Sequence, residues 1–364
     1  MMSLLVSLNQ SCKKKEEPVE ECCETSDNRV FNPTYFNLQK PPYFPDFPQT
    51  YKLSEEGVAL GRKLFYEKRL SGDGTQSCAS CHSQEFAFTD NGRQFSKGID
   101  GKEGDMNAMS LFNLGYSIGF FWNGRSATLQ DQAIEPVINP IEMHNTWEKA
   151  INTIKGDKEY IDMFYAAFGT DNWDSTHAAE AISQFELTLL SYGSEYDEAV
   201  AKINGDPNID PPLPPSPYRG LRIFNSEPTP TGGGGDCFHC HNSDNMLFTN
   251  NSYMNNGLDS DPEDGLMEVS GRASDKGKFK VPTLRNVEFT GPYMHDGRFE
   301  TLEEVIDFYN TDVKDSPTLD KIMKDHGIAG GLNLTNQEKA DLVAFLKTLS
   351  DPSFKTNPAF SDPN

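Results

Sequence analysis

The stretch Cys78-Ala79-Ser80-Cys81-His82 recurs later in the chain as Cys237-Phe238-His239-Cys240-His241, and the two copies divide the sequence into comparable halves. Both have the pattern C-x-x-C-H, in which two thiols stand one turn apart and an imidazole follows directly. Such thiols can add to the two vinyl groups of one haem, and the imidazole then reaches the iron on one face. We therefore interpret each copy as a covalent attachment site for a haem of the c type. The predicted ligands are Cys78, Cys81 and His82 for the first haem, and Cys237, Cys240 and His241 for the second.

Two other interpretations of the cysteines are open at this point. Paired C-x-x-C motifs often hold zinc, but a zinc ribbon places its pairs closer together and needs no histidine after each second cysteine. A thioredoxin-type redox pair follows a strand at the start of a helix, and no βαβ pattern surrounds either copy. The histidine that completes both copies favours haem.

Composition limits the class of protein. The chain has 364 residues, enough for two domains, and 32 basic against 55 acidic residues give it a formal charge of −23. This charge argues against nucleic acid as a partner. It fits a solvated acidic surface as well as it fits a field that attracts a basic redox partner. No run of about 18 apolar residues predicts a membrane span.

The N-terminus carries an export signal. The apolar fragment Leu4–Leu8 is followed by Ser11-Cys12 and then by a charged stretch, which resembles a bacterial lipoprotein signal in which Cys12 is acylated. An ordinary thiol is the alternative for Cys12. Cys22 and Cys23 lie in an acidic tether and receive no role. Because haem c is attached outside the cytoplasm, we expect a periplasmic protein with a lipid anchor to the membrane.

Helix signals outnumber strand signals. Ser54 is a predicted N-cap, and Asp174–Tyr192 has the apolar spacing of a helix with Tyr192 on its buried face. The pairs Thr301/Glu304 and Thr335/Glu338 predict capping boxes. We expect a mainly α protein with two cytochrome c-like haem domains and long loops. The predicted segments are a signal and tether at 1–30, a first haem domain at 31–206, a Pro/Gly-rich linker at 207–235, a second haem domain at 236–352 and a tail at 353–364.

Several ordered blocks between and after the two haem motifs resemble the bacterial di-haem cytochrome c peroxidase family, which includes the MauG-type enzymes. The resemblance runs from about Ser54 to Leu349. It implies that the first haem reacts with hydrogen peroxide and that the second relays electrons to it. The blocks are Leu111–Asn113, Phe121–Arg125, Leu129–Ala133 with Gln132, Pro136, Glu142–Met143, Val281–Val287 and Gly291–Gly297.

The resemblance also assigns catalytic roles. Glu142 is the acid/base that takes a proton from one peroxide oxygen and returns it to the oxygen that leaves as water, and Gln132 holds the peroxide by hydrogen bonds. A surface Glu and an amphipathic-helix Gln are the plain alternatives. Trp122 matches the tryptophan between the haems that assists electron transfer; a buried core Trp is the plain alternative, and the two interpretations are not exclusive. By the same resemblance, Asn107, Thr290 and Pro292 hold one calcium ion through oxygen atoms.

Two departures from the family pattern bear on the iron ligands. Many members close the first haem with a second histidine, and the matching position here is Gly98, which predicts an open, five-coordinate iron. His144 is a substitute ligand or, more plainly, a surface histidine. The sixth ligand of the second haem stands fourteen residues after His295, at Tyr309, as in the MauG-type branch. Met294 is the competing ligand, with core packing as its plain alternative.

Three functions are therefore weighed. The first is a periplasmic di-haem peroxidase that reduces hydrogen peroxide with electrons from a small donor such as a cytochrome c or a cupredoxin. The second is a MauG-like oxidase that modifies Trp or Tyr of a partner protein. The third is a di-haem electron-transfer or haem-sensing protein without turnover, which predicts two six-coordinate irons. Members of the di-haem peroxidase family include monomers and homodimers, so either state is expected here.

Overall fold

The computed structural model describes residues 29–229, 232–325 and 331–364. Residues Phe31–Asn364 form one compact unit, and the remaining residues at the N-terminus form a separate one. The predicted signal, the acylated Cys12 and the two tether cysteines lie outside the described residues.

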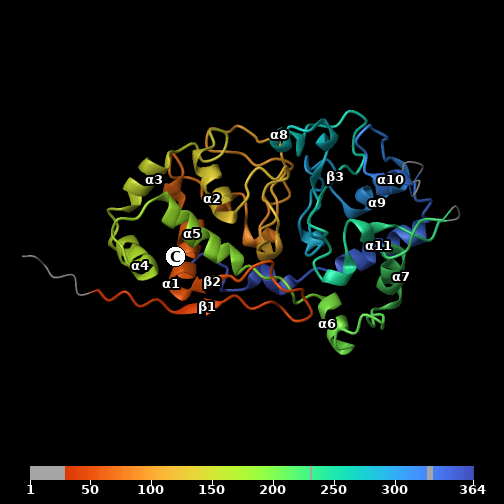
Figure 1. The fold of residues 1–364 in the computed structure, drawn as a ribbon, viewed down its shortest axis with the longest axis horizontal. Helices are drawn as coiled ribbons and strands as arrows, with labels where there is room; N and C mark the ends of the chain where they lie inside the picture. Colours follow the sequence, from red (N-terminus) through yellow and green to blue (C-terminus); the bar gives the residue numbers. More distant parts are fainter. Residues whose placement is uncertain (1–28, 230–231, 326–330) are drawn as a thin grey trace, which may run out of the picture. The chain divides into compact units, whose positions relative to one another are not determined.

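The described chain is mainly helical, as predicted (Figure 1). Its helices are α1 (Glu55–Phe65), α2 (Leu129–Ile138), α3 (Trp147–Ile154), α4 (Lys158–Phe168), α5 (Ser175–Leu187), α6 (Glu195–Lys202), α7 (Pro215–Phe224), α8 (Met267–Ser270), α9 (Leu302–Thr311), α10 (Lys321–Asp325) and α11 (Asn336–Lys347). The strands β1 (Tyr35–Asn37) and β2 (Lys52–Ser54) form one antiparallel ladder, and β3 (Tyr253–Met254) and β4 (Phe279–Lys280) form another.

A close crossing of α1 and α5 organises the first half. Ser54 caps α1 by accepting a hydrogen bond from the Gly57 N–H, as predicted. A Cβ atom on Gly61 would stand 1.8 Å from the carbonyl oxygen of Ala181, so only glycine allows the two backbones to approach this closely. One turn later, the rings of Phe65 and Phe185 pack with centroids 5.4 Å apart.

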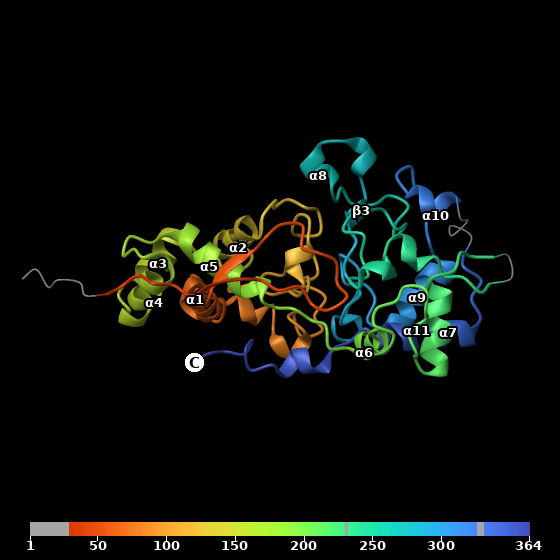
Figure 2. The same ribbon diagram turned by 60° about the horizontal axis from the view of Figure 1, so that its bottom comes forward.

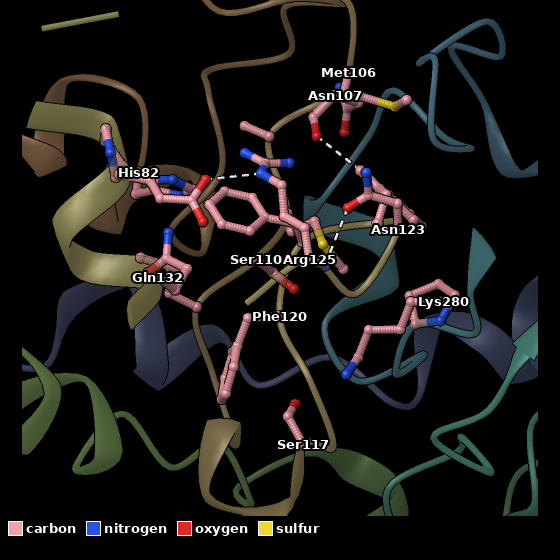
Figure 3. A pocket seen from close by; sticks show the side chains of 18 of the residues that line it. His82, Met106, Asn107, Ser110, Ser117, Phe120, Asn123, Arg125, Gln132 and Lys280 are labelled. Atoms are coloured by element: carbon pink, nitrogen blue, oxygen red, sulfur yellow. Dashed lines mark hydrogen bonds and ion pairs between the residues drawn. The ribbon is translucent and has the colours of Figure 1, made fainter. Parts of the chain in front are cut away.

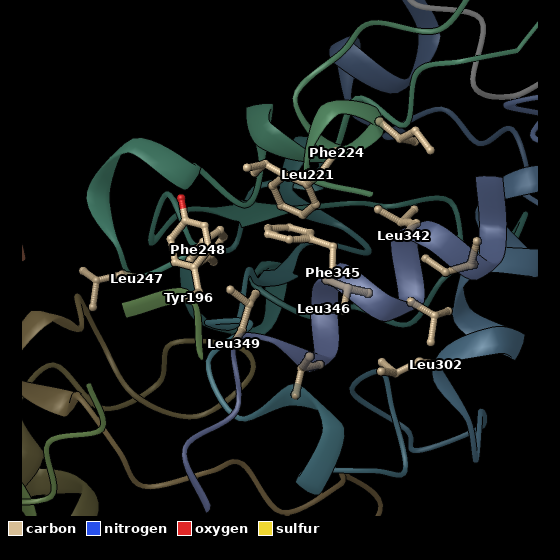
Figure 4. Packing of buried hydrophobic residues seen from close by; sticks show 14 of the residues in the cluster. Tyr196, Leu221, Phe224, Leu247, Phe248, Leu302, Leu342, Phe345, Leu346 and Leu349 are labelled. Atoms are coloured by element: carbon tan, nitrogen blue, oxygen red, sulfur yellow. The ribbon is translucent and has the colours of Figure 1, made fainter. Parts of the chain in front are cut away.

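The second half repeats this crossing with α7 and α11. A Cβ atom on Gly220 would stand 2.0 Å from the carbonyl oxygen of Asp341, and the rings of Phe224 and Phe345 pack 5.2 Å apart. Figure 4 shows these rings inside the apolar cluster of this half. The two glycines, Gly61 and Gly220, each stand seventeen residues before the first cysteine of a C-x-x-C-H motif. The two halves are thus built on one plan.

The structure confirms some of the other predictions and corrects others. The predicted capping boxes at Thr301 and Thr335 are confirmed. The helix expected over Asp174–Tyr192 ends at Leu187, and Tyr192 is 48% exposed, so its predicted burial is wrong. The segment 207–235, predicted as a linker, contains α7. Prolines are tolerated in the first turn of a helix, because their fixed φ suits the helix and the N–H that they lack would have no partner within it.

The C-terminal residues fold back onto the first half. The Arg62 guanidinium of α1 donates to the Ser361 carbonyl at 2.6 Å, and the Tyr66 hydroxyl donates to the Phe360 carbonyl at 2.7 Å. Figure 2 shows this segment passing below α1. The segment expected as a tail therefore packs as part of the compact unit. None of the helices in the described residues is long and apolar enough to cross a membrane.

The glycine crossings make a stability prediction. Gly61→Ala and Gly220→Ala each force a methyl group onto a backbone carbonyl, so we expect each to lower the free energy of unfolding by about 3 kcal/mol. Denaturant titration measures the change. Gly156→Ala is the control, because its added Cβ meets no atom within 4 Å, and a loss at Gly156 equal to that at the crossings would contradict the argument.

Candidate functional site

The first haem motif presents its histidine in one orientation. Cys78–Ser80 forms a single 3₁₀ turn, and the His82 Nδ1 atom lies 3.1 Å from the carbonyl oxygen of Phe88. A carbonyl only accepts, so Nδ1 carries the proton and Nε2 is left free to bind a metal. Phe88 is fully buried against Phe354 of the C-terminal segment, which fixes the carbonyl that orients the imidazole.

The second motif is oriented in the same way. Cys237–His239 forms a 3₁₀ turn, and the His241 Nδ1 atom donates to the Phe248 carbonyl at 3.1 Å. Burial lowers the pKa of His241 to about 4 and also lowers the pKa of His82, which keeps both imidazoles neutral at pH 7. Neutral imidazole is the form that binds a metal ion.

The four cysteines fit thioether attachment better than the two alternatives. All four are free thiols, and burial raises the pKa of Cys81 to about 11 and that of Cys237 and Cys240 to about 12. A redox-active pair needs a lowered pKa. A zinc site needs its ligands together, and no group of three His, Cys, Asp or Glu residues suited to a metal ion occurs in the described part of the chain. The residues present therefore fit two covalently bound haems.

Each motif opens onto its own cavity, and the two cavities share a wall. The first cavity is lined by Cys81 and His82, and the second by Cys237, Cys240 and His241. The residues that line both are Asn107–Ser110, Trp122 and Lys280–Thr283. Trp122 is held in this wall, because its indole Nε1 donates to the Asn107 carbonyl at 2.9 Å. The structure thus places Trp122 between the two predicted haem sites.

Glu142 and Gln132 line the first cavity together with His82 (Figure 3). Gln132 comes from α2, and Glu142 from the turn that follows it. Burial raises the pKa of Glu142, against the opposing effects of a hydrogen bond from Asn139 Nδ2 at 2.7 Å and of the Arg125 charge. The carboxylate can thus take up and release a proton nearer to neutral pH than an exposed glutamate.

The position of the absent histidine is sterically closed. A Cβ atom on Gly98 would stand 2.2 Å from the Ile141 carbonyl and 2.6 Å from the Glu142 carbonyl, so no side chain fits there in this conformation. His144 is half-exposed, and its Nδ1 pairs with Asp100 at 2.7 Å. It is not among the residues that line either cavity, so the structure supports the surface interpretation of His144.

Both candidate sixth ligands of the second haem line the second cavity. The Tyr309 hydroxyl accepts a hydrogen bond from Asn256 Nδ2 at 3.1 Å, and the same nitrogen lies 3.6 Å from the Met294 sulfur. Burial raises the pKa of Tyr309 well above its ordinary value, and the Asn256 hydrogen bond opposes this. A donor at the phenol oxygen favours the charged form of a tyrosine ligand.

The residues of the expected calcium site also meet at the second cavity. Asn107, Thr290 and Pro292 all line it. Asn107 is buried, and its Nδ2 donates to the carbonyls of Arg93 and Gln94 at 3.2 and 3.1 Å, so its side-chain oxygen is the atom left to accept. Oxygen donors of this kind suit Ca²⁺.

Three residues of the site were not predicted from the sequence. Asn139 holds Glu142, Asn256 contacts both Tyr309 and Met294, and Lys280 lines both cavities. The Asn139-Pro140 pair was a visible turn signal directly before Glu142. Nothing in the pattern of single residues pointed to Asn256 or Lys280.

Comparisons with known proteins agree with this geometry. A family model described as di-haem cytochrome c peroxidase matches residues 55–205. The chain is 34% identical over 303 residues to cytochrome c551 peroxidase of Nitrosomonas europaea, covering 81% of each chain. It is 30% identical over 309 residues to the methylamine utilization protein MauG of Methylophilus methylotrophus, covering 85% of this chain and 86% of the relative.

A solved structure is similar over almost the whole chain. It is the crystal structure of a MauG-like protein associated with microbial copper homeostasis, with a TM-score of 0.75 and 36% identity. The match covers 90% of this chain and 99% of that one. With two equivalent haem motifs, a shared wall and relatives at this level of identity, the chain belongs to the di-haem cytochrome c peroxidase and MauG family.

Proposed function

We propose that this protein is a di-haem peroxidase that reduces hydrogen peroxide to water with two electrons from a small redox protein. The observation that carries the proposal is the pairing, in one cavity, of a half-buried acid/base with an oriented histidine. Glu142 and His82 line the same cavity, and Gly98 leaves no room for a second histidine. When bound, the haem supplies an iron that accepts peroxide and passes electrons.

The protein residues supply the proton chemistry. The Glu142 carboxylate takes the proton from one oxygen of hydrogen peroxide and returns it to the other, so that the second oxygen leaves as water. The Gln132 amide binds the peroxide and stabilises the charge that develops as the O–O bond breaks. Asn139 holds the carboxylate in place. With two electrons and two protons from outside, one peroxide yields two waters.

Electrons enter from a donor protein and cross the wall between the cavities. Trp122 lies in that wall, and its hydrogen bond to Asn107 fixes the ring. We infer that Trp122 shortens the path between the haems. A cytochrome c is the favoured donor, because the relatives carry the name cytochrome c peroxidase, and a cupredoxin is the alternative.

The proposal extends to a calcium ion and to the place of the protein in the cell. One Ca²⁺ bound by the Asn107 side chain and by the carbonyls of Thr290 and Pro292 would stiffen the same wall. Covalent haem attachment implies the periplasm, and acylated Cys12 would tether the protein to a membrane as a monomer or a homodimer. Tyr309 is our choice for the sixth ligand of the second haem, with Met294 as its competitor.

A second candidate function is a MauG-like oxidation of Trp or Tyr residues on a partner protein. Two observations favour it: Tyr309 lines the second cavity with a hydrogen bond from Asn256, and a MauG-like structure matches this chain at 36% identity. Both enzymes use the same open first site. They differ in whether the electrons come from a redox donor or from the side chain that is modified.

Replacing Glu142 tests the proton step. We expect Glu142→Gln to keep both haems and to lower peroxide turnover by about 10²- to 10⁴-fold, because the amide cannot accept the proton. Steady-state oxidation of a reduced cytochrome c measures turnover, and the pyridine haemochrome spectrum counts the haems. Glu148→Gln, the same change on the exposed first turn of α3, is the control. Full turnover in the Glu142 variant would remove this residue from the mechanism.

The pH dependence follows from the raised pKa of Glu142. The base must be deprotonated to act, so turnover should fall as the pH is lowered through its pKa. Because burial raises this pKa, the loss should occur above pH 4.5, the ordinary value for a glutamate. A kcat/KM profile between pH 4 and 8 measures the acidic limb, which is the pH range in which turnover is lost. Its persistence in the residual activity of Glu142→Gln would assign the limb to another group.

The state of the two irons separates a peroxidase from an electron carrier. We expect the EPR spectrum of the isolated diferric protein to show one high-spin and one low-spin haem, since Gly98 leaves the first iron open. One equivalent of hydrogen peroxide should remove both signals within seconds. Two low-spin signals that peroxide leaves unchanged would indicate two closed irons and an electron-transfer protein without turnover.

A further inference from the structure

Lys280 is a buried cation in the wall between the two haem cavities. It lines both cavities and is 7% exposed. Its ammonium forms no ion pair with any carboxylate of the residues described, unlike the nearby Lys276 and Lys278, which pair with Asp261 and Asp275. A buried charge without a counter-charge is costly, so an anion placed beside Lys280 would be stabilising.

The hydrogen bonds of Lys280 tie it to the segment that carries Trp122. Its Nζ donates to the Ile118 carbonyl at 3.1 Å and to the Gly119 carbonyl at 2.7 Å, and its backbone N–H donates to the Trp122 carbonyl at 2.8 Å. An ammonium has three N–H donors. The third donor makes no hydrogen bond within the described residues, and the ammonium lies 5.9 Å from the centroid of the Phe120 ring.

The internal repeat gives this position a counterpart. Lys280 stands six residues before Asn286, as Asn107 stands six residues before Asn113, and each asparagine follows the same local path with φ near 55°. The halves exchange hydrogen bonds at these points: Asn107 N–H donates to the His295 carbonyl, and Lys280 N–H donates to the Trp122 carbonyl. At these equivalent positions, the first half thus has the neutral amide of Asn107 and the second half has the positive charge of Lys280.

The direction of the ammonium favours the first cavity. The carbonyls that it binds belong to Ile118 and Gly119, and Gly119 and its neighbour Phe120 line the first cavity and not the second. In Figure 3, Lys280 lies across this cavity from Gln132. Each haem of the family carries two propionate carboxylates, and these are the anions that a haem bound in this cavity would supply.

We propose that Lys280 donates its third N–H to a propionate of the first haem, and so joins this haem to the segment that carries Trp122. It is a positioning residue: it touches the rim of the haem and fixes the tryptophan between the two haems. A positive charge at that propionate would favour the reduced state of the first iron. Burial lowers the pKa of Lys280 to about 8, and a propionate beside it would raise this pKa again.

The test is a reduction potential, which does not depend on peroxide turnover. In Lys280→Met we expect the ratio of reduced to oxidised first haem to fall about tenfold at a fixed potential, a shift of about 59 mV. Lys280→Arg should keep most of the original potential. Lys276→Met is the control, because it removes one charge from an exposed pair on the same loop. Pyridine haemochrome spectra should show two haems in each variant.

Two results would overturn the proposal. One is a first-haem potential in Lys280→Met equal to that in Lys276→Met, and the other is a shift confined to the second haem. Where Lys280→Met does not retain its haems, the resonance Raman propionate-bending band of Lys280→Arg decides the question. A guanidinium donor should move that band relative to the wild type, and an unmoved band counts against the contact. Neither readout needs Glu142, so failure of the peroxidase proposal would leave this test intact.

Discussion

The close backbone contact at Gly61 and at Gly220 is the constraint on which the rest of the structure depends. In each half it lets two helices cross without an intervening side chain, and the phenylalanine rings one turn later fill the space beside the crossing. The chain then has seventeen residues in which to reach the first cysteine of its haem motif. The same crossing followed by the same length of chain delivers each motif to the same place in its half.

A second constraint joins the halves. The Asn113 N–H donates to the carbonyl of Leu189, which follows α5. In the other half, the Asn286 N–H donates to the carbonyl of Leu349, which follows α11. In the segments that precede these asparagines, the Asn107 N–H donates to the His295 carbonyl and the Lys280 N–H donates to the Trp122 carbonyl, so each half forms a backbone hydrogen bond to the other. These two backbone hydrogen bonds, together with the indole hydrogen bond to the Asn107 carbonyl, hold Trp122 where both cavities meet. An electron path between two haems requires such a fixed wall, because electron transfer depends on distance.

The parts of the site that the sequence could predict are those fixed by local chemistry. The C-x-x-C-H motifs define covalent attachment within five residues, and the caps at Ser54, Thr301 and Thr335 depend on contacts within one turn. The end of α5 was missed because Leu189 continues the apolar spacing beyond the last helical turn, while the segment bends away to meet Asn113. Lys280 was missed for a related reason, since its neighbours come from a segment about 160 residues away.

The internal repeat also explains how the same local structure can hold two haems with different proposed roles. Both halves orient a histidine by donating its Nδ1 proton to a phenylalanine carbonyl, so the iron-binding side is the same in each. The difference lies in what the chain places elsewhere in each cavity. The first cavity has Gly98, where a backbone contact excludes any side chain, and a protonatable Glu142. The second has Tyr309 and Met294, the two proposed sixth ligands, within reach of the Asn256 amide. The proposed division between a reactive haem and an electron-relaying haem thus depends on side chains, while the helix crossing and the histidine hydrogen bond are equivalent in both halves.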